Sequence, residues 1–246
     1  ILDGREKQLV LETVIEQANG RVPVYAGTGC VSTRETIAQS RMARDAGADV
    51  LSIITPSFAA ASQQELYDHY RAVAEAVDIP IVLYNIPART GNALAPETVA
   101  SLSRIENIVG AKDSSGNWDN MKAYLDGTRG SGFAVLSGND GLILDCLKNG
   151  GRGGVAGCAN VYPRTMASIY DCFAAGDLEK AQEYQASIAS FRACFKYGNP
   201  NTVVKTAVAL LGYDVGKCRA PFNQLPEEGV AALRQVLREN AEKGMH

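Results

Sequence analysis

Short apolar segments alternate with longer amphipathic segments over the first two thirds of the chain. The apolar segments are mostly continuous, which is typical of parallel strands covered by helices on the sheet faces. Strands are predicted at residues 23–27, 49–55, 80–84, 108–112, 133–136 and 154–157. The segments between them predict helices at residues 32–46, 62–76, 95–103, 118–126 and 141–148. A strand followed by a helix, repeated, indicates right-handed βαβ units in an α/β protein.

The remainder of the pattern is helical. A helix is predicted at residues 5–17, and from about residue 162 onward helices are predicted at residues 163–175, 177–193, 201–211 and 226–243. Asp177 and Pro226 stand where a helix start favours a cap or a first-turn proline.

The strand count favours a (β/α)8 barrel, also called a TIM barrel, with a C-terminal helical extension. Residues 1–161 are expected to form the barrel, and residues 162–246 its last helix and the helical region. About six of eight strands are found, so the N-terminal β-α-β portion is expected to be missing from the sequence. The alternative is an open doubly wound sheet, which leaves the helical tail unexplained.

Composition excludes several function classes. The chain has 246 residues, a net charge of −3 and 46% hydrophobic residues, which fits a soluble globular protein with no nucleic-acid and no membrane partner. The first residues lack the features of a signal peptide. Six scattered cysteines form no C-x-x-C pair and are expected to be reduced, mostly buried thiols in a cytoplasmic protein.

Metal and phosphate sites are weakly supported. The only histidines are His69, expected at a surface or half-buried helix position, and His246, so no metal site is predicted. The glycines within residues 149–154 precede a predicted strand and are expected to end a helix. A phosphate cradle needs glycines after a strand and before a helix. A phosphate-binding barrel enzyme is therefore the function that this pattern favours least. No cofactor is predicted.

Candidate chemistry lies at two strand ends, where barrel enzymes place their active sites. Lys112 ends one predicted strand, and apolar surroundings would disfavour its charged form, leaving an amine able to form an imine with a ketone. Tyr84 ends the preceding strand and could relay protons, and Arg89 could bind a substrate carboxylate. Alone, such a lysine is more often a surface charge and such a tyrosine a packed ring. The combination favours a site.

Two segments carry a family resemblance: YNIPARTG at residues 84–91 and GAKDSSGN at residues 110–117. Shorter matches are VYAGTG at 24–29, LSGND at 136–140 and NP at 199–200. Across nearly its whole length the chain resembles the dihydrodipicolinate synthase / N-acetylneuraminate lyase family. The resemblance implies a class I lyase or aldolase that condenses or releases pyruvate without a metal. It also implies a homotetramer or homodimer.

Residue roles follow from the same resemblance. Lys112 matches the Schiff-base lysine and Tyr84 the proton-relaying phenol. Arg89 matches the arginine that, in the synthase branch, meets the carboxylate of the second substrate. Gly138 and the backbone carbonyl of Val155 match positions that line the pyruvate pocket.

The chain departs from the family pattern at two places. The loop that binds the pyruvate carboxylate in the family is expected before Ile1. A tyrosine that members often present from a neighbouring subunit is replaced by Phe58, which cannot relay a proton.

Besides the phosphate-binding barrel enzyme, three functions therefore stay open. The first is a synthase joining pyruvate to an aldehyde such as aspartate semialdehyde, in lysine biosynthesis. The second is an aldolase for a 2-keto-3-deoxy sugar acid, a 4-hydroxy-2-oxo acid or N-acetylneuraminate. The third is a non-catalytic relative that binds a keto acid.

Overall fold

The computed structural model describes residues 2–246. The chain divides into two compact units. The first holds residues 2–139 and 149–152, and the second holds residues 140–148 and 153–246. Across the described residues, no helix has the length and apolar character needed to cross a membrane.

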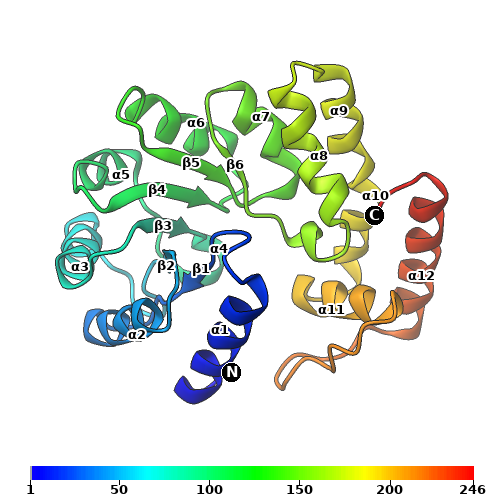
Figure 1. The fold of residues 1–246 in the computed structure, drawn as a ribbon, viewed down its shortest axis with the longest axis horizontal. Helices are drawn as coiled ribbons and strands as arrows, with labels where there is room; N and C mark the ends of the chain where they lie inside the picture. The colour runs from blue at the N-terminus through cyan, green and yellow to red at the C-terminus, as the bar shows by residue number, and fades with distance from the viewer. Residues whose placement is uncertain (1) are drawn as a thin grey trace. The chain divides into compact units, whose positions relative to one another are not determined.

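A parallel sheet forms the centre of the first unit (Figure 1). Its strands, in the order β1-β2-β3-β4-β5, are Tyr25–Gly27, Val50–Ile54, Ile81–Asn85, Ile108–Asp113 and Ala134–Ser137. Each lies within two residues of its predicted position. The order follows the chain and never reverses, whereas a doubly wound sheet reverses at its switch point. The sheet is therefore a half barrel rather than a doubly wound sheet.

Helices cover the outer side of this sheet, as Figure 1 shows for α2, α3, α5 and α6. The helices of the first unit are α1 Gly4–Ala18, α2 Thr33–Asp45, α3 Gln63–Ala76, α4 Pro87–Thr90, α5 Pro96–Leu102 and α6 Trp118–Gly127. Ser32 and Ser62 cap α2 and α3, since each side chain accepts a hydrogen bond from a first-turn amide. The sequence pattern did not predict α4, which has only one turn.

The core of the first unit lies between the strands and these helices. Leu51, Ile53 and Leu83 on the strands and Leu66 and Val73 on α3 are almost fully buried. Burying one such side chain stabilises a fold by about 1.5–3 kcal/mol. Leu51, Ile53 and Leu83 share one sheet face, which is therefore buried, whereas the alternate residues of β2 are half-buried.

His69 was expected at a surface or half-buried helix position, and this expectation is wrong because the side chain is buried. It lies on the buried face of α3, one turn from Leu66 and one from Val73. Its Nδ1 is 2.9 Å from Thr33 Oγ1, and its ring meets the edge of Tyr70. Burial lowers the pKa of His69 to about 4, so the ring is neutral near pH 7.

The second unit is mainly helical. It contains α7 Ile143–Lys148, β6 Gly153–Gly154, α8 Pro163–Ala174, α9 Leu178–Ser187, α10 Ala189–Ala193, α11 Pro200–Leu210 and α12 Glu227–Glu242, with short 3-10 helices at Asp140–Leu142, Gly157–Asn160 and Cys194–Tyr197. Phe191 is fully buried and meets Tyr162 edge-on at 5.4 Å between ring centroids. Asn240 on α12 donates to the Tyr162 hydroxyl at 3.0 Å. The core of this unit therefore joins its helices to one another.

Two predicted elements of the second unit are wrong in extent. The helix predicted at 177–193 is two helices, because the Ile188 amide donates to Ala186 rather than continuing the helical ladder. The strand predicted at 154–157 is reduced to β6, because a 3-10 helix begins at Gly157. The six cysteines are free, and three of them, Cys146, Cys158 and Cys194, are buried.

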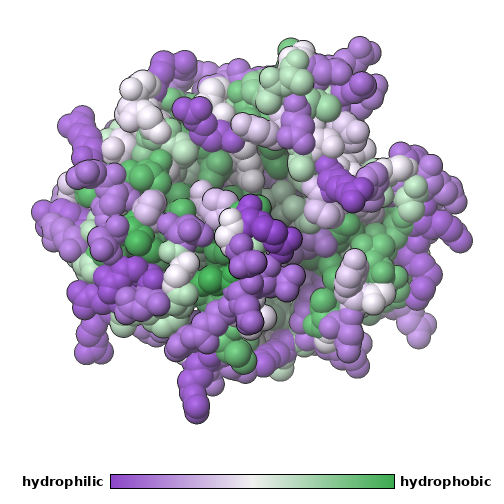
Figure 2. All heavy atoms as spheres, viewed as in Figure 1, coloured by the Kyte–Doolittle hydropathy of each residue, from purple (hydrophilic) through white to green (hydrophobic). Residues whose placement is uncertain are grey.

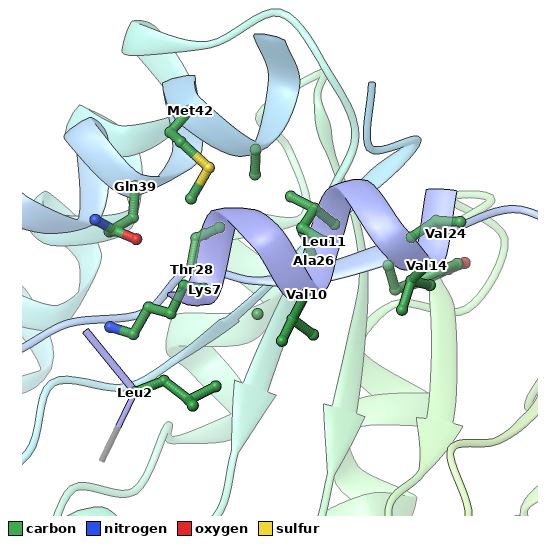
Figure 3. Close-up of a pocket in the computed structure, with 13 residues that line it drawn as sticks. Leu2, Lys7, Val10, Leu11, Val14, Val24, Ala26, Thr28, Gln39 and Met42 are labelled. Carbon is green, nitrogen blue, oxygen red and sulfur yellow. The ribbon is translucent and has the colours of Figure 1, made fainter. Parts of the chain in front are cut away.

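Strand β1 ends the strand order of the first unit and pairs only with β2. Helix α1 buries none of its residues completely, and Leu9, Val10 and Val14 remain 64%, 51% and 47% exposed. A cavity of about 250 Å³ lies beside α1, β1 and α2, and Figure 3 shows its mainly apolar lining. On the face of the molecule drawn in Figure 2, patches of apolar surface, shown in green, lie between polar residues, shown in purple. This edge of the first unit is thus open and apolar.

Candidate active site

Tyr84 and Lys112 lie side by side at the carboxyl ends of β3 and β4. They are register partners in the parallel ladder, so their side chains leave the same face of the sheet. Lys112 Nζ lies 3.7 Å from the centroid of the Tyr84 ring. Both side chains are half-buried, and the Tyr84 hydroxyl has no hydrogen-bond partner among residues 2–246. An amine and a free phenol therefore meet at one strand edge.

Gly138 directly follows β5, the third strand that ends beside Tyr84 and Lys112. Its amide donates to the Asp113 carbonyl at 2.8 Å, which holds the backbone close to β4. A β-carbon at this position would overlap Ser114 Oγ and lie 2.9 Å from Lys112 Cε. Only glycine leaves room for both side chains.

Ser114 is a polar residue at the site that the sequence reasoning missed. Its Oγ is buried and has no hydrogen-bond partner within residues 2–246. Its position in the sequence, directly after Lys112 and Asp113 at the end of a predicted strand, could have indicated that it belongs to the site. A buried hydroxyl without a partner is uncommon, and it lies next to the Lys112 side chain.

Arg89 lies on α4, between Tyr84 and the loop that follows. The helix begins with Pro87 and ends at Gly91, whose φ of 80° allows the turn. The Arg89 side chain is exposed and forms none of the ion pairs found in the described part of the chain. Its guanidinium is therefore available to an anionic ligand.

Val155 belongs to the second unit. It directly follows β6 and is 44% exposed. Its predicted part in a pyruvate pocket stays a prediction.

The loop after β2 presents Phe58 to solvent. Phe58 is 98% exposed and has a φ of 85°, a left-handed conformation that costs energy for a bulky residue. Asn92, which is buried, holds this loop: its amide donates to the carbonyls of Pro56 and Ala59, and its Oδ1 accepts from the Ala61 amide. The sequence reasoning missed Asn92, although it lies three residues after Arg89.

Other phenols near the strand ends have structural roles. Tyr70 donates to the Ile53 carbonyl and Tyr124 to the Leu94 carbonyl. Burial raises the pKa of both hydroxyls far above the usual range, and the charge of Asp113 adds to this effect at Tyr124. Both hydroxyls therefore stay protonated as donors. Residues 2–246 contain no group of three or more His, Cys, Asp or Glu side chains placed to bind a metal.

Comparison with known proteins gives the family. The model of the dihydrodipicolinate synthetase family matches residues 1–240. The chain belongs to this family. The resemblance seen in the two strand-end segments is confirmed.

Relatives support the same assignment. The 4-hydroxy-tetrahydrodipicolinate synthases of Methanospirillum hungatei and Methanothrix thermoacetophila are 39% and 43% identical. Each alignment covers 96% of this chain, and 81% and 79% of the respective relatives. The dihydrodipicolinate synthase of Acinetobacter baumannii, solved with pyruvate, is 35% identical with a TM-score of 0.92. That alignment covers 98% of this chain and 82% of the other.

Proposed function

We propose that the protein is a 4-hydroxy-tetrahydrodipicolinate synthase that joins pyruvate to aspartate semialdehyde through an imine on Lys112. The observation that carries the proposal is the position of Lys112 Nζ over the Tyr84 ring at 3.7 Å. An amine held beside a phenol at the carboxyl ends of barrel strands has the parts that imine chemistry needs. The names of the relatives, and the pyruvate bound to one of them, support the choice of substrates.

The chemistry assigns a role to each side chain. The neutral amine of Lys112 attacks the ketone carbon of pyruvate, and the oxygen leaves as water once it has been protonated. The resulting iminium draws electrons from the neighbouring carbon, which loses a proton and becomes an enamine. The enamine carbon then forms a bond to the aldehyde carbon of the second substrate, whose carbonyl oxygen takes a proton and becomes a hydroxyl. The amino group of that substrate attacks the iminium carbon and displaces Lys112 as a free amine. The Tyr84 hydroxyl gives and takes the protons in these steps.

Substrate carboxylates need their own partners. Arg89 is exposed and free of ion pairs among the described residues, so it suits the carboxylate of aspartate semialdehyde. In this proposal Gly138 lines the pyruvate pocket, and the Val155 carbonyl keeps the role that the family resemblance implies.

A closed (β/α)8 barrel is the fold that goes with this function. The unpaired edge of β1 and the exposed apolar residues of α1 support it, because a closed barrel leaves no strand edge open. In this proposal residues 1–161 form the barrel, and residues 162–246 form its last helix and the helical region.

Self-association and location complete the proposal. Phe58 projects from a braced loop with 98% of its surface exposed, as expected for a side chain that inserts into a second copy of this chain. A homodimer or homotetramer would bury it. Six free thiols are consistent with a cytoplasmic protein.

Trapping the imine tests the function. The protein is incubated with pyruvate and borohydride, and its intact mass is measured. We expect one reduced pyruvate adduct, located on Lys112 by peptide mapping and absent from Lys112→Ala. Lys122→Ala is the matched control, because Lys122 is an exposed lysine that pairs with Asp126 on α6. An adduct that survives Lys112→Ala would contradict the proposal.

Phe58 favours a second candidate, an aldolase for a 2-keto-3-deoxy sugar acid, a 4-hydroxy-2-oxo acid or N-acetylneuraminate. The side chain lacks the hydroxyl found at this position in many members. Assays of condensation with aspartate semialdehyde and of 2-keto-3-deoxygluconate cleavage, run side by side, separate the two. Pyruvate binding with no turnover of any aldehyde would instead indicate a non-catalytic keto-acid-binding relative.

A further inference from the structure

A hydrogen bond joins β3 and β4 directly behind the candidate site. Asn85 follows Tyr84, Asp113 follows Lys112, and Asn85 and Asp113 are register partners like the pair before them. Asn85 Nδ2 donates to Asp113 Oδ1 at 2.8 Å. Since side chains alternate across a strand, this bond lies on the opposite sheet face from Tyr84 and Lys112.

The surroundings hold both members of this bond rigidly. Asn85 and Asp113 are 1% and 0% exposed. Asn85 Oδ1 accepts from the Leu94 amide at 3.0 Å, which fixes the orientation of the Asn85 amide. Asp113 Oδ1 also accepts from the Ser115 amide, and its Oδ2 accepts from Ser115 Oγ and Asn120 Nδ2.

Asp113 is a carboxylate without a cation. None of the ion pairs among residues 2–246 includes it, and its four donors are neutral groups. Burying an unpaired carboxylate is costly, and packing alone would be served as well by an apolar side chain. The Asp113 carboxylate differs from an apolar side chain because it forms a directional hydrogen bond. This bond holds β4 to Asn85 on β3, one position beyond Lys112.

We infer that Asn85 and Asp113 are positioning residues, whose hydrogen bond fixes the distance between the Tyr84 hydroxyl and Lys112 Nζ. The inference rests on the proposed function of that pair. One backbone bond joins the ends of the two strands, from the Ser114 amide to the Asn85 carbonyl at 2.8 Å, and loops follow. The side-chain bond between Asn85 and Asp113 adds a second link at the last register position and keeps the amine beside the phenol.

Imine formation is the first measurement. The rate of pyruvate trapping by borohydride is followed in single turnover for the wild type and Asn85→Ala. We expect roughly a ten- to hundredfold loss, the range for displacing a reacting group by a fraction of an ångström to 1 Å. Asn120→Ala is the control, because it removes one donor to Asp113 Oδ2 and leaves the bond to Asn85 intact. It should change the rate less than about twofold.

A swap of the two side chains separates positioning from stability. Asn85→Asp alone places two carboxylates against each other and should lower the rate further. Adding Asp113→Asn restores one donor and one acceptor, and we expect most of the rate to return. In the Tyr84→Phe background, Asn85→Ala should have a much smaller effect, since the hydroxyl it displaces is absent. The inference would be overturned if the trapping rates of the variants simply followed their melting temperatures. In that case Asp113→Asn would not rescue the rate, and Asn85→Ala would have the same effect with and without the Tyr84 hydroxyl.

The outcome for the wild type distinguishes a failure of the proposed function. If wild-type protein traps no pyruvate, the function fails, and positioning is measured without substrate as the acetylation rate of Lys112 in peptides. Asn85→Ala should raise that rate by releasing the amine from the Tyr84 ring, while Asn120→Ala should not. Equal acetylation in all three proteins would overturn the positioning role.

Discussion

The backbone of Gly138 lies so close to Ser114 that a β-carbon there would overlap Ser114 Oγ. Gly138→Ala should therefore push Ser114 and the Lys112 side chain, whose Cε would be 2.9 Å away. We expect a loss of turnover of roughly ten- to hundredfold, measured as kcat. Adding Ser114→Gly should restore part of it by removing the clashing atoms.

Gly127→Ala is the matched control for this prediction. A β-carbon there would meet Ala100 at 3.7 Å, an ordinary contact. Turnover should be unchanged. If Gly138→Ala proves as active as Gly127→Ala, the close approach of Gly138 to the site is not important for catalysis.

Tyr84→Phe removes the free phenol and should lower kcat by about 10²–10⁴, the usual contribution of a general acid or base. Melting temperature should hardly change, because the hydroxyl has no partner among residues 2–246. Tyr124→Phe should do the reverse. It removes a buried hydrogen bond to Leu94, at a cost of about 0.5–1.5 kcal/mol in the free energy of unfolding, and leaves kcat near normal. Similar kcat values for the two variants would contradict the role of Tyr84.

Arg89→Ala should raise KM for aspartate semialdehyde by about 10- to 100-fold, the loss expected for a charged hydrogen bond of about 1.5–3 kcal/mol. KM for pyruvate should stay within about twofold, since the predicted partner of Arg89 is the other substrate. Steady-state kinetics with each substrate varied in turn provide the measurement. Arg104→Ala, also at an exposed arginine, serves as the control. An equal rise in both KM values would argue against this assignment.

His69 should make stability depend on pH. The pKa of His69 is about 4 in the folded protein, whereas an unfolded histidine titrates near about 6.5, so the unfolded chain takes up the proton first on acidification. From about pH 6.5 down to about pH 4, the free energy of unfolding should fall by at most about 1.4 kcal/mol per pH unit. Above this range the group has no effect, and below it the loss is constant.

Urea denaturation at several pH values measures this dependence. His69→Gln should flatten the profile between about pH 6.5 and pH 4. His246→Gln, at the other histidine, which is exposed, serves as the control. A profile equally steep in wild type and His69→Gln would assign the acid sensitivity to other groups.

Phe58 should influence the oligomeric state. Phe58→Ala is expected to weaken self-association, measured as the dissociation constant in sedimentation, by removing an exposed aromatic side chain of the kind that dominates interfaces. Asn92→Ala should have a similar effect without touching Phe58, because its amide holds three backbone groups of the same loop. Tyr213→Ala, at another exposed aromatic residue, is the control. Unchanged association in Phe58→Ala would exclude Phe58 from the interface.

Local pattern was sufficient for most of the fold. The five strands of the first unit lie within two residues of their predicted positions. They could be predicted because each is a continuous apolar run between amphipathic segments, a pattern that is visible in the sequence without the fold. The break at Ile188 and the short β6 were not predicted, since both depend on hydrogen bonds that no local pattern specifies. His69 was misjudged, although its spacing from Leu66 and Val73 indicated a buried helix face.

The amino-acid pattern was enough to indicate the family, the alternation of strands and helices, and Lys112, Tyr84 and Arg89 as candidate site residues. The position of Lys112 Nζ over the Tyr84 ring and the bond between Asn85 and Asp113 became visible only in the folded chain. Both depend on the register of β3 against β4. Residues 28 positions apart become neighbours only when β3 and β4 pair, and the alignment of two parallel strands is set by packing across the whole sheet.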